Sequence, residues 1–269
     1  MIASSTFVLL GIMGAFGIIL PLCVSIWWIK TRKEKISTIL LGALAFFAFA
    51  LVLEGTIHTI VFLLVPSLAK NVIAYTIYGA LMAGLFEETG RYFFFKVVLK
   101  KRTNRETAIS YGIGHGGFEA LYILLATSIQ YIVYAVMINN GQFQTLIDAV
   151  ASSGGDTSAV QLLPDAIASI TPGVVALGCF ERISAMIFHI AMSILVFYAV
   201  KKSKAALYIL AILLHALLDV PAALYQTGVI TNQLVLELII FVFAVACIIL
   251  MIKLLYNKDT QTKEVEESV

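Results

Sequence analysis

Seven long apolar stretches dominate the chain and are separated by short polar segments. They cover residues 7–29, 37–65, 72–98, 107–138, 173–200, 205–225 and 234–255. A helix needs about 20 mainly apolar residues to cross the hydrocarbon core of a bilayer, and all seven stretches reach that length. Their apolar residues are continuous instead of alternating, which argues against a transmembrane β-barrel. The pattern therefore predicts an all-α bundle of about seven transmembrane helices, in a multi-pass protein of the cell membrane.

Composition supports this prediction. Hydrophobic residues make up 61% of the 269 residues and charged residues 13%, whereas soluble domains average about 45–50% and about 25%. Disordered chains are poor in these apolar residue types. A formal net charge of +2 leaves no basic face for nucleic acid, and the three cysteines form no Cys-x-x-Cys pair and no even set for disulfides. We therefore expect membrane lipids as the surroundings and no nucleic-acid partner.

Lysine and arginine are distributed unevenly between the two ends of the predicted helices. Fifteen of the 18 lie at or just beyond the ends of the first, third, fifth and seventh stretches. Cytoplasmic loops carry an excess of these residues, so the distribution predicts an N-out, C-in topology. The first stretch has no basic residue before it, and we expect it to be a true span and not a cleaved signal.

The polar segments predict a simple domain organisation. Residues 1–256 are expected to form a single integral membrane domain with its core at 72–226, followed by a flexible cytoplasmic tail at 257–269. The one long loop is an extracytoplasmic segment at 139–172, either a plain surface loop or a lid over a cavity. Part of it has the apolar spacing of a short interfacial helix, at Phe143, Leu146, Ile147 and Val150.

Ionisable residues occur inside the predicted spans, where an unpaired charge costs several kcal/mol. All four histidines of the chain lie there. Counting the helical rise from the nearest cytoplasmic basic residue puts Glu88 and His189 about 18 Å deep. The same count puts His115 and His215 about 15 and 16 Å deep. Four helices thus carry a carboxylate or an imidazole at one level, which predicts a shared polar cavity bounded by the third to sixth spans.

A second layer of charged residues lies near this level. Glu119 follows His115 by four residues, and Asp219 follows His215 by four residues. Side chains at this spacing share a helix face. Arg182 lies two turns before the histidine of the fifth span. We expect Glu119 and Arg182 to support the site.

Three other intramembrane residues are expected to lie outside the site: His58, Glu54 and Glu237. His58, with Glu54 one turn before it, lies near the outer end of the second span, and such a pair commonly hydrogen-bonds between helices. Glu237, at the start of the last span, is expected at the membrane interface. Glycines near the histidines are expected to let helices approach closely: Gly84, Gly90, Gly112, Gly114, Gly116 and Gly117.

The sharpest local motif is Glu87-Glu88-Thr89-Gly90-Arg91. Adjacent carboxylates in a low-dielectric medium cannot both ionise cheaply, so one of them is expected to hold a proton, which suits acid–base chemistry. Arg91 is four residues after Glu87 and three after Glu88, so it can pair with either. The alternative is a purely structural salt bridge at a helix kink.

The order of these motifs resembles the CPBP superfamily, the membrane peptidases that include CAAX-prenyl and bacteriocin-processing proteases. There, a double Glu with a nearby Arg precedes an aromatic-x-x-x-His helix and a His-x-x-x-Asn/Asp helix. Tyr111 and His115 look like the second motif, and His215 and Asp219 look like the third. The run Gly-His-Gly-Gly-Phe-Glu at 114–119 is most similar to the YhfC-type branch of intramembrane peptidases. The resemblance covers the third to sixth spans, about half the chain.

The resemblance implies an intramembrane endopeptidase, a hydrolase acting on membrane-embedded or membrane-associated peptide or protein substrates. Glu87, aided by His115, would activate a water for attack on a peptide carbonyl. Glu88 and Arg91 would hold this base in place. Here Arg91 comes one residue earlier than in the usual Glu-Glu-x-x-x-Arg spacing.

The same resemblance implies an oxyanion site. His215 together with Asp219 would stabilise the oxyanion, a contribution typically worth a few kcal/mol per donor, and His189 is a further donor. Asp219 stands where the superfamily often has Asn, and an ionised Asp cannot donate a hydrogen bond. Asp219 is therefore either protonated, or it orients His215.

Metal-free glutamate chemistry without a cofactor is the leading prediction, and a zinc-assisted variant is its alternative. Three histidines and a glutamate at one depth are a plausible catalytic zinc set. The candidate ligands are Glu87, His115, His189 and His215. The chain lacks a compact His-x-x-x-His pair, so these ligands would come from separate helices.

Three other functions remain open at this point. A non-catalytic membrane scaffold or assembly subunit would resemble the helical subunit of γ-secretase that is similar to this superfamily, but here the double Glu is intact. A proton-coupled transporter would use the glutamates and histidines as a relay and would predict inverted repeats. Paired histidines on facing helices would also allow haem ligation. The sequence identifies neither the substrate nor the oligomeric state.

Overall fold

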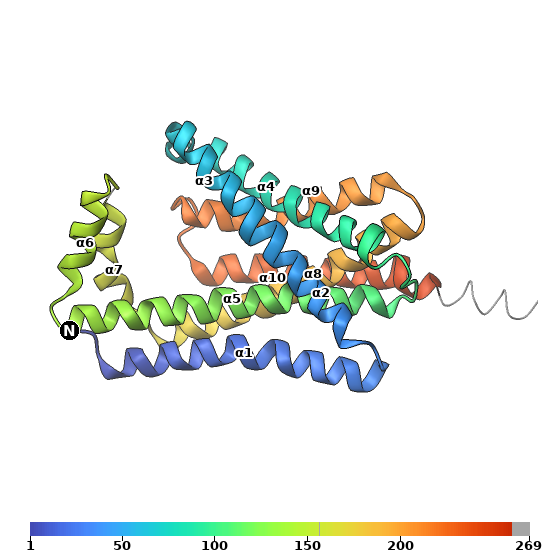
Figure 1. The fold of residues 1–269 in the computed structure, drawn as a ribbon, viewed down its shortest axis with the longest axis horizontal. Helices are drawn as coiled ribbons and strands as arrows, with labels where there is room; N and C mark the ends of the chain where they lie inside the picture. Colours follow the sequence, from blue (N-terminus) through green and yellow to red (C-terminus); the bar gives the residue numbers. More distant parts are fainter. Residues whose placement is uncertain (156, 260–269) are drawn as a thin grey trace, which may run out of the picture. The chain divides into compact units, whose positions relative to one another are not determined.

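The computed structural model describes residues 1–155 and 157–259, and every regular element within them is a helix. This confirms the predicted all-α polytopic bundle for that part of the chain. Most of the predicted tail at 257–269 lies outside the described residues. The helices shown in Figure 1 are α1 (Ser4–Arg32), α2 (Ile36–Phe46), α3 (Gly55–Leu64), α4 (Val72–Phe93), α5 (Glu106–Asn139), α6 (Phe143–Ser152), α7 (Ser158–Ala168), α8 (Pro172–Lys201), α9 (Ala205–Gln226) and α10 (Gln233–Met251).

Four shorter helical segments of other types connect or extend these helices. Three are π-helices, η1 (Phe47–Glu54), η3 (Phe94–Val98) and η4 (Ile252–Tyr256), and one is a 3-10 helix, η2 (Pro66–Lys70). The segment η1 joins α2 to α3, so the predicted second span is one continuous helix with a π-helical middle. A π-helical turn holds an extra residue and rotates the side chains that follow it. Glu54, the last residue of η1, is buried.

Local chemistry explains where two helices of the site begin and end. Asn71 caps α4 because its side-chain oxygen accepts a hydrogen bond from the backbone N–H three residues later, at 3.0 Å. Helix α9 ends two residues before Gly228, whose φ of +78° is in the left-handed region that favours glycine. These boundaries fix the level of the residues that α4 and α9 carry.

Six helical stretches of the described residues are long and apolar enough to cross a membrane. They are Ser4–Arg32, Ile36–Leu64, Glu106–Asn139, Pro172–Lys201, Ala205–Gln226 and Gln233–Asp259. The sequence predicts about seven, and the difference is α4. Its inner half carries Glu87 and Glu88, which lower its mean hydropathy. Both side chains are buried among other helices instead of facing the surroundings.

The chain divides into two compact units. The first consists of Met1–Leu20 with Ala120–Phe180, and the second of Pro21–Glu119 together with the chain from Glu181 onward. In the first unit, Ile2, Ala135 and Ile167 form a small buried core. Its segment 139–172 was expected to contain one short interfacial helix and contains two, α6 and α7. Every candidate site residue named from the sequence belongs to the second unit.

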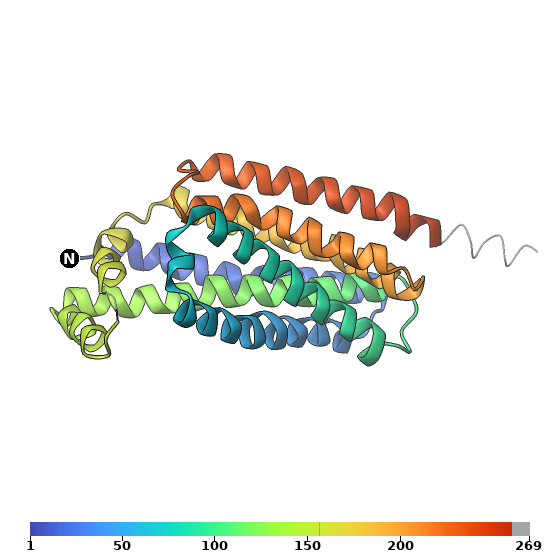
Figure 2. The same cartoon turned by 90° about the horizontal axis from the view of Figure 1, so that it is seen from above.

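Close backbone contacts at glycines hold the second unit together. A Cβ atom built at Gly114 of α5 would lie 1.8 Å from the carbonyl oxygen of Ile39 in α2, and one at Gly84 of α4 would lie 2.6 Å from the carbonyl oxygen of Ile212 in α9. No residue other than glycine fits such contacts, which confirms the predicted packing role. Helices α4 and α9 run side by side in both views (Figures 1 and 2).

Candidate functional site

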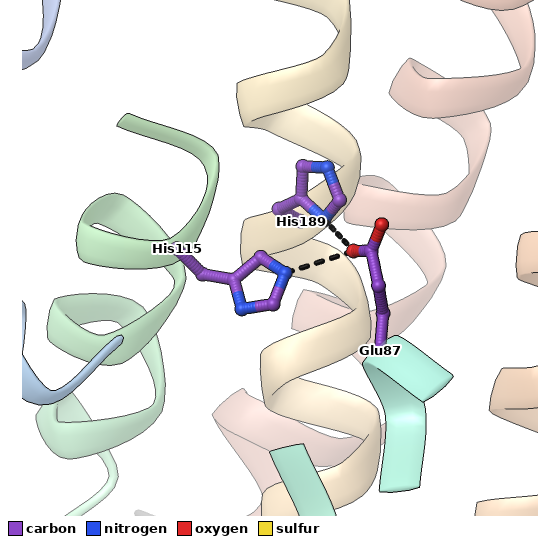
Figure 3. A group of neighbouring side chains, drawn as sticks. All are labelled: Glu87, His115 and His189. Carbon is purple, nitrogen blue, oxygen red and sulfur yellow. Dashed lines mark hydrogen bonds and ion pairs between the residues drawn. The ribbon is translucent and has the colours of Figure 1, made fainter. Parts of the chain in front are cut away.

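Four helices bring one carboxylate and three imidazoles together. Glu87 comes from α4, His115 from α5, His189 from α8 and His215 from α9. Oε2 of Glu87 lies 2.8 Å from Nε2 of His115 and 3.7 Å from Nδ1 of His189. The same oxygen lies 3.9 Å from Nε2 of His215. Figure 3 shows the first two histidines pointing toward the same oxygen of the Glu87 carboxylate, and all four side chains are buried.

Glu88 is the second carboxylate of the pair and has different partners. It accepts hydrogen bonds from Nη1 of Arg91 at 3.0 and 3.2 Å, and its Oε1 lies 2.6 Å from Nδ1 of His215. Arg91 lies 3.1 Å from Nδ1 of His189 through Nη2, and 3.9 Å from Glu87. Arg91 and Glu88 are fully buried. Arg91 therefore neutralises Glu88 directly and lies farther from Glu87.

Glu119 has the same relation to His189 that Glu88 has to His215. Glu119 contacts Nε2 of His189 through one oxygen, while its other oxygen accepts a hydrogen bond from Nη1 of Arg182 at 2.7 Å. Arg182 also contacts Glu181. In both pairs a carboxylate engages one ring nitrogen and leaves the other nitrogen facing Glu87. Carboxylates placed in this way fix the tautomer and the orientation of an imidazole.

Asp219 lies at the edge of the group. Its Oδ2 is 3.6 Å from Nε2 of His215 and has no hydrogen-bond partner among the described residues. Its side chain is 31% exposed, whereas that of Glu87 is 10% exposed. Both residues line a cavity of about 160 Å³ together with Glu119, Arg182, His189 and His215. Asp219 is therefore more exposed than Glu87.

Sequence reasoning missed two features around this cavity. His58, placed outside the site from the sequence, lines a second cavity that also reaches Asp219, and Glu54 contacts His58. Glu237, expected at the membrane interface, is buried near the start of α10. No signal along the chain marks the first feature, since it depends on contacts between α3 and α4.

The donor set fits a metal ion. Glu87, His115 and His189 each offer one ligand atom, and these atoms lie within 4.8 Å of one another. Tetrahedral zinc ligands about 2.1 Å from the ion are roughly 3.4 Å apart. The separations of 2.8 and 3.7 Å from the Glu87 oxygen lie on either side of that value. Nitrogen and oxygen donors backed by a carboxylate on His189 are those that zinc prefers.

Comparisons with known proteins identify the family of this chain. A family model described as "YhfC intramembrane metalloprotease" matches residues 16–240. The chain is also 37% identical over 258 residues to the "Uncharacterized membrane protein YhfC" of Bacillus subtilis (strain 168), covering 94% of this chain and 98% of that protein. No solved structure matches. The family match spans most of the chain and includes every residue of the cluster, and the chain therefore belongs to the YhfC intramembrane metalloprotease family.

Proposed function

We propose that the protein is a metal-dependent intramembrane endopeptidase whose hydrolytic centre is the cluster around Glu87. The observation that carries this proposal is one carboxylate oxygen lying within 3.9 Å of a ring nitrogen from each of three histidines. Burying so many ionisable groups costs more than their pairing returns in stability. Such a cost is typical of a reaction centre and not of a packing contact.

Glu87, His115 and His189 would hold the metal, with zinc as the ion whose preferred ligands match this set. Bound there, zinc would supply a Lewis acid that activates water and polarises the peptide carbonyl of the substrate. Glu119 engages Nε2 of His189 and leaves Nδ1, which lies 3.1 Å from Nη2 of Arg91 and 3.7 Å from Glu87, as the ligand atom. This positioning role needs the contact of Glu119 with Arg182, which prevents the carboxylate from turning away.

His215 is placed to move a proton. Its Nδ1 donates to Glu88 at 2.6 Å, so Nε2 is the basic nitrogen and faces the cavity. Nε2 takes a proton from the attacking water and returns it to the nitrogen of the leaving amine. Glu88, held by Arg91, stabilises the imidazolium that exists between these two transfers. Asp219, 3.6 Å from Nε2, limits how the ring can turn.

A metal-free mechanism with the same residues is the second candidate. The 2.8 Å contact between Nε2 of His115 and Oε2 of Glu87 favours it, because a histidine hydrogen-bonded to a carboxylate can assist that carboxylate as a general base. In this mechanism Glu87 takes the proton from water. The two mechanisms differ in what the variant Glu87→Gln does to metal content.

The test uses the purified full chain and membranes from cells that produce it. Metal per chain is measured by mass spectrometry, and new protein N-termini are identified by terminal labelling. The variant Glu87→Gln is compared with Glu237→Gln, which makes the same change in a buried glutamate of α10 outside the cluster.

Loss of both the metal and the new N-termini in Glu87→Gln alone supports the metal-dependent mechanism. Loss of the new N-termini from a protein that holds no metal in either form supports the metal-free mechanism. Identical N-termini from the starting protein and from Glu87→Gln would refute an endopeptidase centred on this residue.

A further inference from the structure

A second cavity adjoins the one at the Glu87 cluster and shares lining residues with it. Its volume is about 280 Å³, and it lies between α3, α4 and α9. Ala83, Asp219 and Ala222 line both cavities. A molecule that fills the larger cavity therefore borders directly on the catalytic one, with Asp219 at the junction.

The larger cavity follows one face of α4 away from the catalytic level. Tyr75, Gly79, Ala83 and Glu87 succeed one another at four-residue intervals, so they lie along a single face. From Tyr75 to Glu87 the helix rises about 18 Å. An extended peptide rises about 3.3 Å per residue, so roughly five residues would span this distance. The path therefore has the length of a short unwound peptide segment.

Aromatic rings form one wall of this cavity. The ring of Phe62 in α3 lies 5.7 Å from that of Tyr78 in a T-shaped arrangement and 6.1 Å from that of Tyr75. These separations are within the range of attractive aromatic pairs. Small residues form much of the remaining wall. A Cβ atom built at Gly79 meets no atom within 4 Å, so this position faces open space. The cavity thus combines an aromatic wall with unfilled room.

The room matches one large side chain. A cavity of about 150 Å³ holds a benzene ring, and this one, at about 280 Å³, has room for a ring and part of the backbone that carries it. A hydrogen bond also connects two of the residues that line the cavity. The hydroxyl of Tyr75 donates to Oε1 of the exposed Gln226 at 2.8 Å, which joins α4 to the last residue of α9.

His58 and Glu54 give Tyr78 its position in this wall. Nδ1 of His58 lies 2.9 Å from the hydroxyl of Tyr78, and its Nε2 lies 3.1 Å from Oε1 of the buried Glu54. The chain Glu54–His58–Tyr78 fixes the ring of Tyr78 relative to Phe62. Glu54 and His58, which look purely structural in the sequence, thus position Tyr78 in the aromatic wall.

We propose that this aromatic cavity, lined by Phe62, Tyr75, Tyr78 and Gly79, is the specificity subsite of the proposed peptidase. It takes one bulky apolar side chain, aromatic in preference to aliphatic, from an extended peptide segment that continues past Asp219 to Glu87. The inference rests on the proposed function for the identity of the ligand as a peptide. The preference for a bulky apolar side chain is inferred from the cavity alone.

The test measures binding separately from cleavage. The Glu87→Gln protein is titrated in detergent micelles with fluorescently labelled five-residue peptides of alanine whose central residue is Phe, Leu or Ala. We expect the Phe peptide to bind at least about tenfold more tightly than the Ala peptide, with Leu between them. Adding Gly79→Trp fills the cavity and should reduce the preference for Phe to less than twofold. Ile77→Trp, on the exposed side of the same helix, should leave it unchanged.

Equal binding of the Phe and Ala peptides, or a preference that survives Gly79→Trp, would overturn the subsite. A co-purifying lipid seen by native mass spectrometry, lost in Gly79→Trp and without any preference among the peptides, would also overturn it and assign the cavity to an acyl chain. Failure of the proposed function would be seen in a separate measurement, as unchanged N-termini in Glu87→Gln. The peptide-binding results can be interpreted in either case, because they do not depend on cleavage. Where cleavage does occur, Tyr78→Ala should reduce the ratio of kcat/KM for Phe over Ala substrates, whereas Ile77→Trp, outside the cavity, should leave that ratio unchanged.

Discussion

Two of the Glu–His contacts in the second unit, Glu54–His58 and Glu87–His115, differ in how many helices they join. Glu54 and His58 are one turn apart on a continuous helical stretch, and their bond reaches one further residue, Tyr78. Glu87 and His115 come from different helices and share their contact with two more histidines. A pair within one helix can satisfy itself locally. Only the convergence of four helices leaves several ligand atoms facing one small volume.

The largest difference is expected when a histidine is removed from each cluster. His189→Ala should lower cleavage on the order of a thousandfold and abolish metal binding, because it removes a proposed ligand that Glu119 orients. His58→Ala should lower cleavage less than about tenfold and leave metal content unchanged. Both are measured as turnover and metal per chain of purified protein. Similar losses in the two variants would contradict the distinction between the clusters.

The next difference concerns folding stability. Arg91→Leu leaves Glu88 buried without its neutralising partner, and we expect it to lower the free energy of unfolding by about 3–5 kcal/mol. Glu54→Gln in the other cluster keeps a hydrogen-bonding group next to a half-exposed histidine and should cost about 1 kcal/mol. Denaturant unfolding in micelles measures both. A neutral Arg91→Leu would show that Glu88 finds another partner.

The third difference is in metal affinity, and it compares Glu119, which contacts His189, with Glu54, which contacts His58. Glu119→Gln should weaken metal binding about 10- to 100-fold, as expected when the carboxylate behind a ligating histidine is lost. Glu54→Gln removes a carboxylate from His58 and should leave metal affinity unchanged. Competition with a chelator of known affinity provides the measurement. An unaltered affinity in Glu119→Gln would place His189 outside the ligand set.

The smallest effect is expected at the wall of the aromatic cavity. Tyr78→Phe removes only the hydrogen bond to His58 and keeps the ring, so it should cost no more than about 1 kcal/mol of unfolding free energy. Metal content should not change. A loss of metal in Tyr78→Phe would mean that the two clusters are coupled more tightly than their contacts indicate.

The sequence predicts the level of the site well, because the rise of a helix is constant. Counting residues from the basic loops predicts a common depth for Glu88, His115, His189 and His215. In the structure, each of the three histidines lies within hydrogen-bonding or near-contact distance of Glu87 or Glu88. Depth does not determine rotation. The sequence therefore cannot tell that His215 faces Glu88 while His115 faces Glu87.

The features that sequence reasoning missed depend on contacts between distant segments. Hydropathy predicts the helix at α4 but not the partners of its acids, which are Arg91 and imidazoles of other helices. The role of His58 depends on the π-helical segment before it and on Tyr78, 20 residues later. Neither the rotation of η1 nor the path of α3 past α4 follows from hydropathy. Both come from side-chain packing that is settled only when the helices meet.

The contact of Gly84 with the carbonyl oxygen of Ile212 has a mechanical consequence. Backbone meets backbone there, with less than the width of a methyl group between α4 and α9. The two helices cannot slide or roll past each other at this point. Separation of the two helices is therefore easier toward Tyr75 and Gln226, which a hydrogen bond connects. The outer ends would swing about a fixed pivot while the glutamates and histidines below keep their spacing.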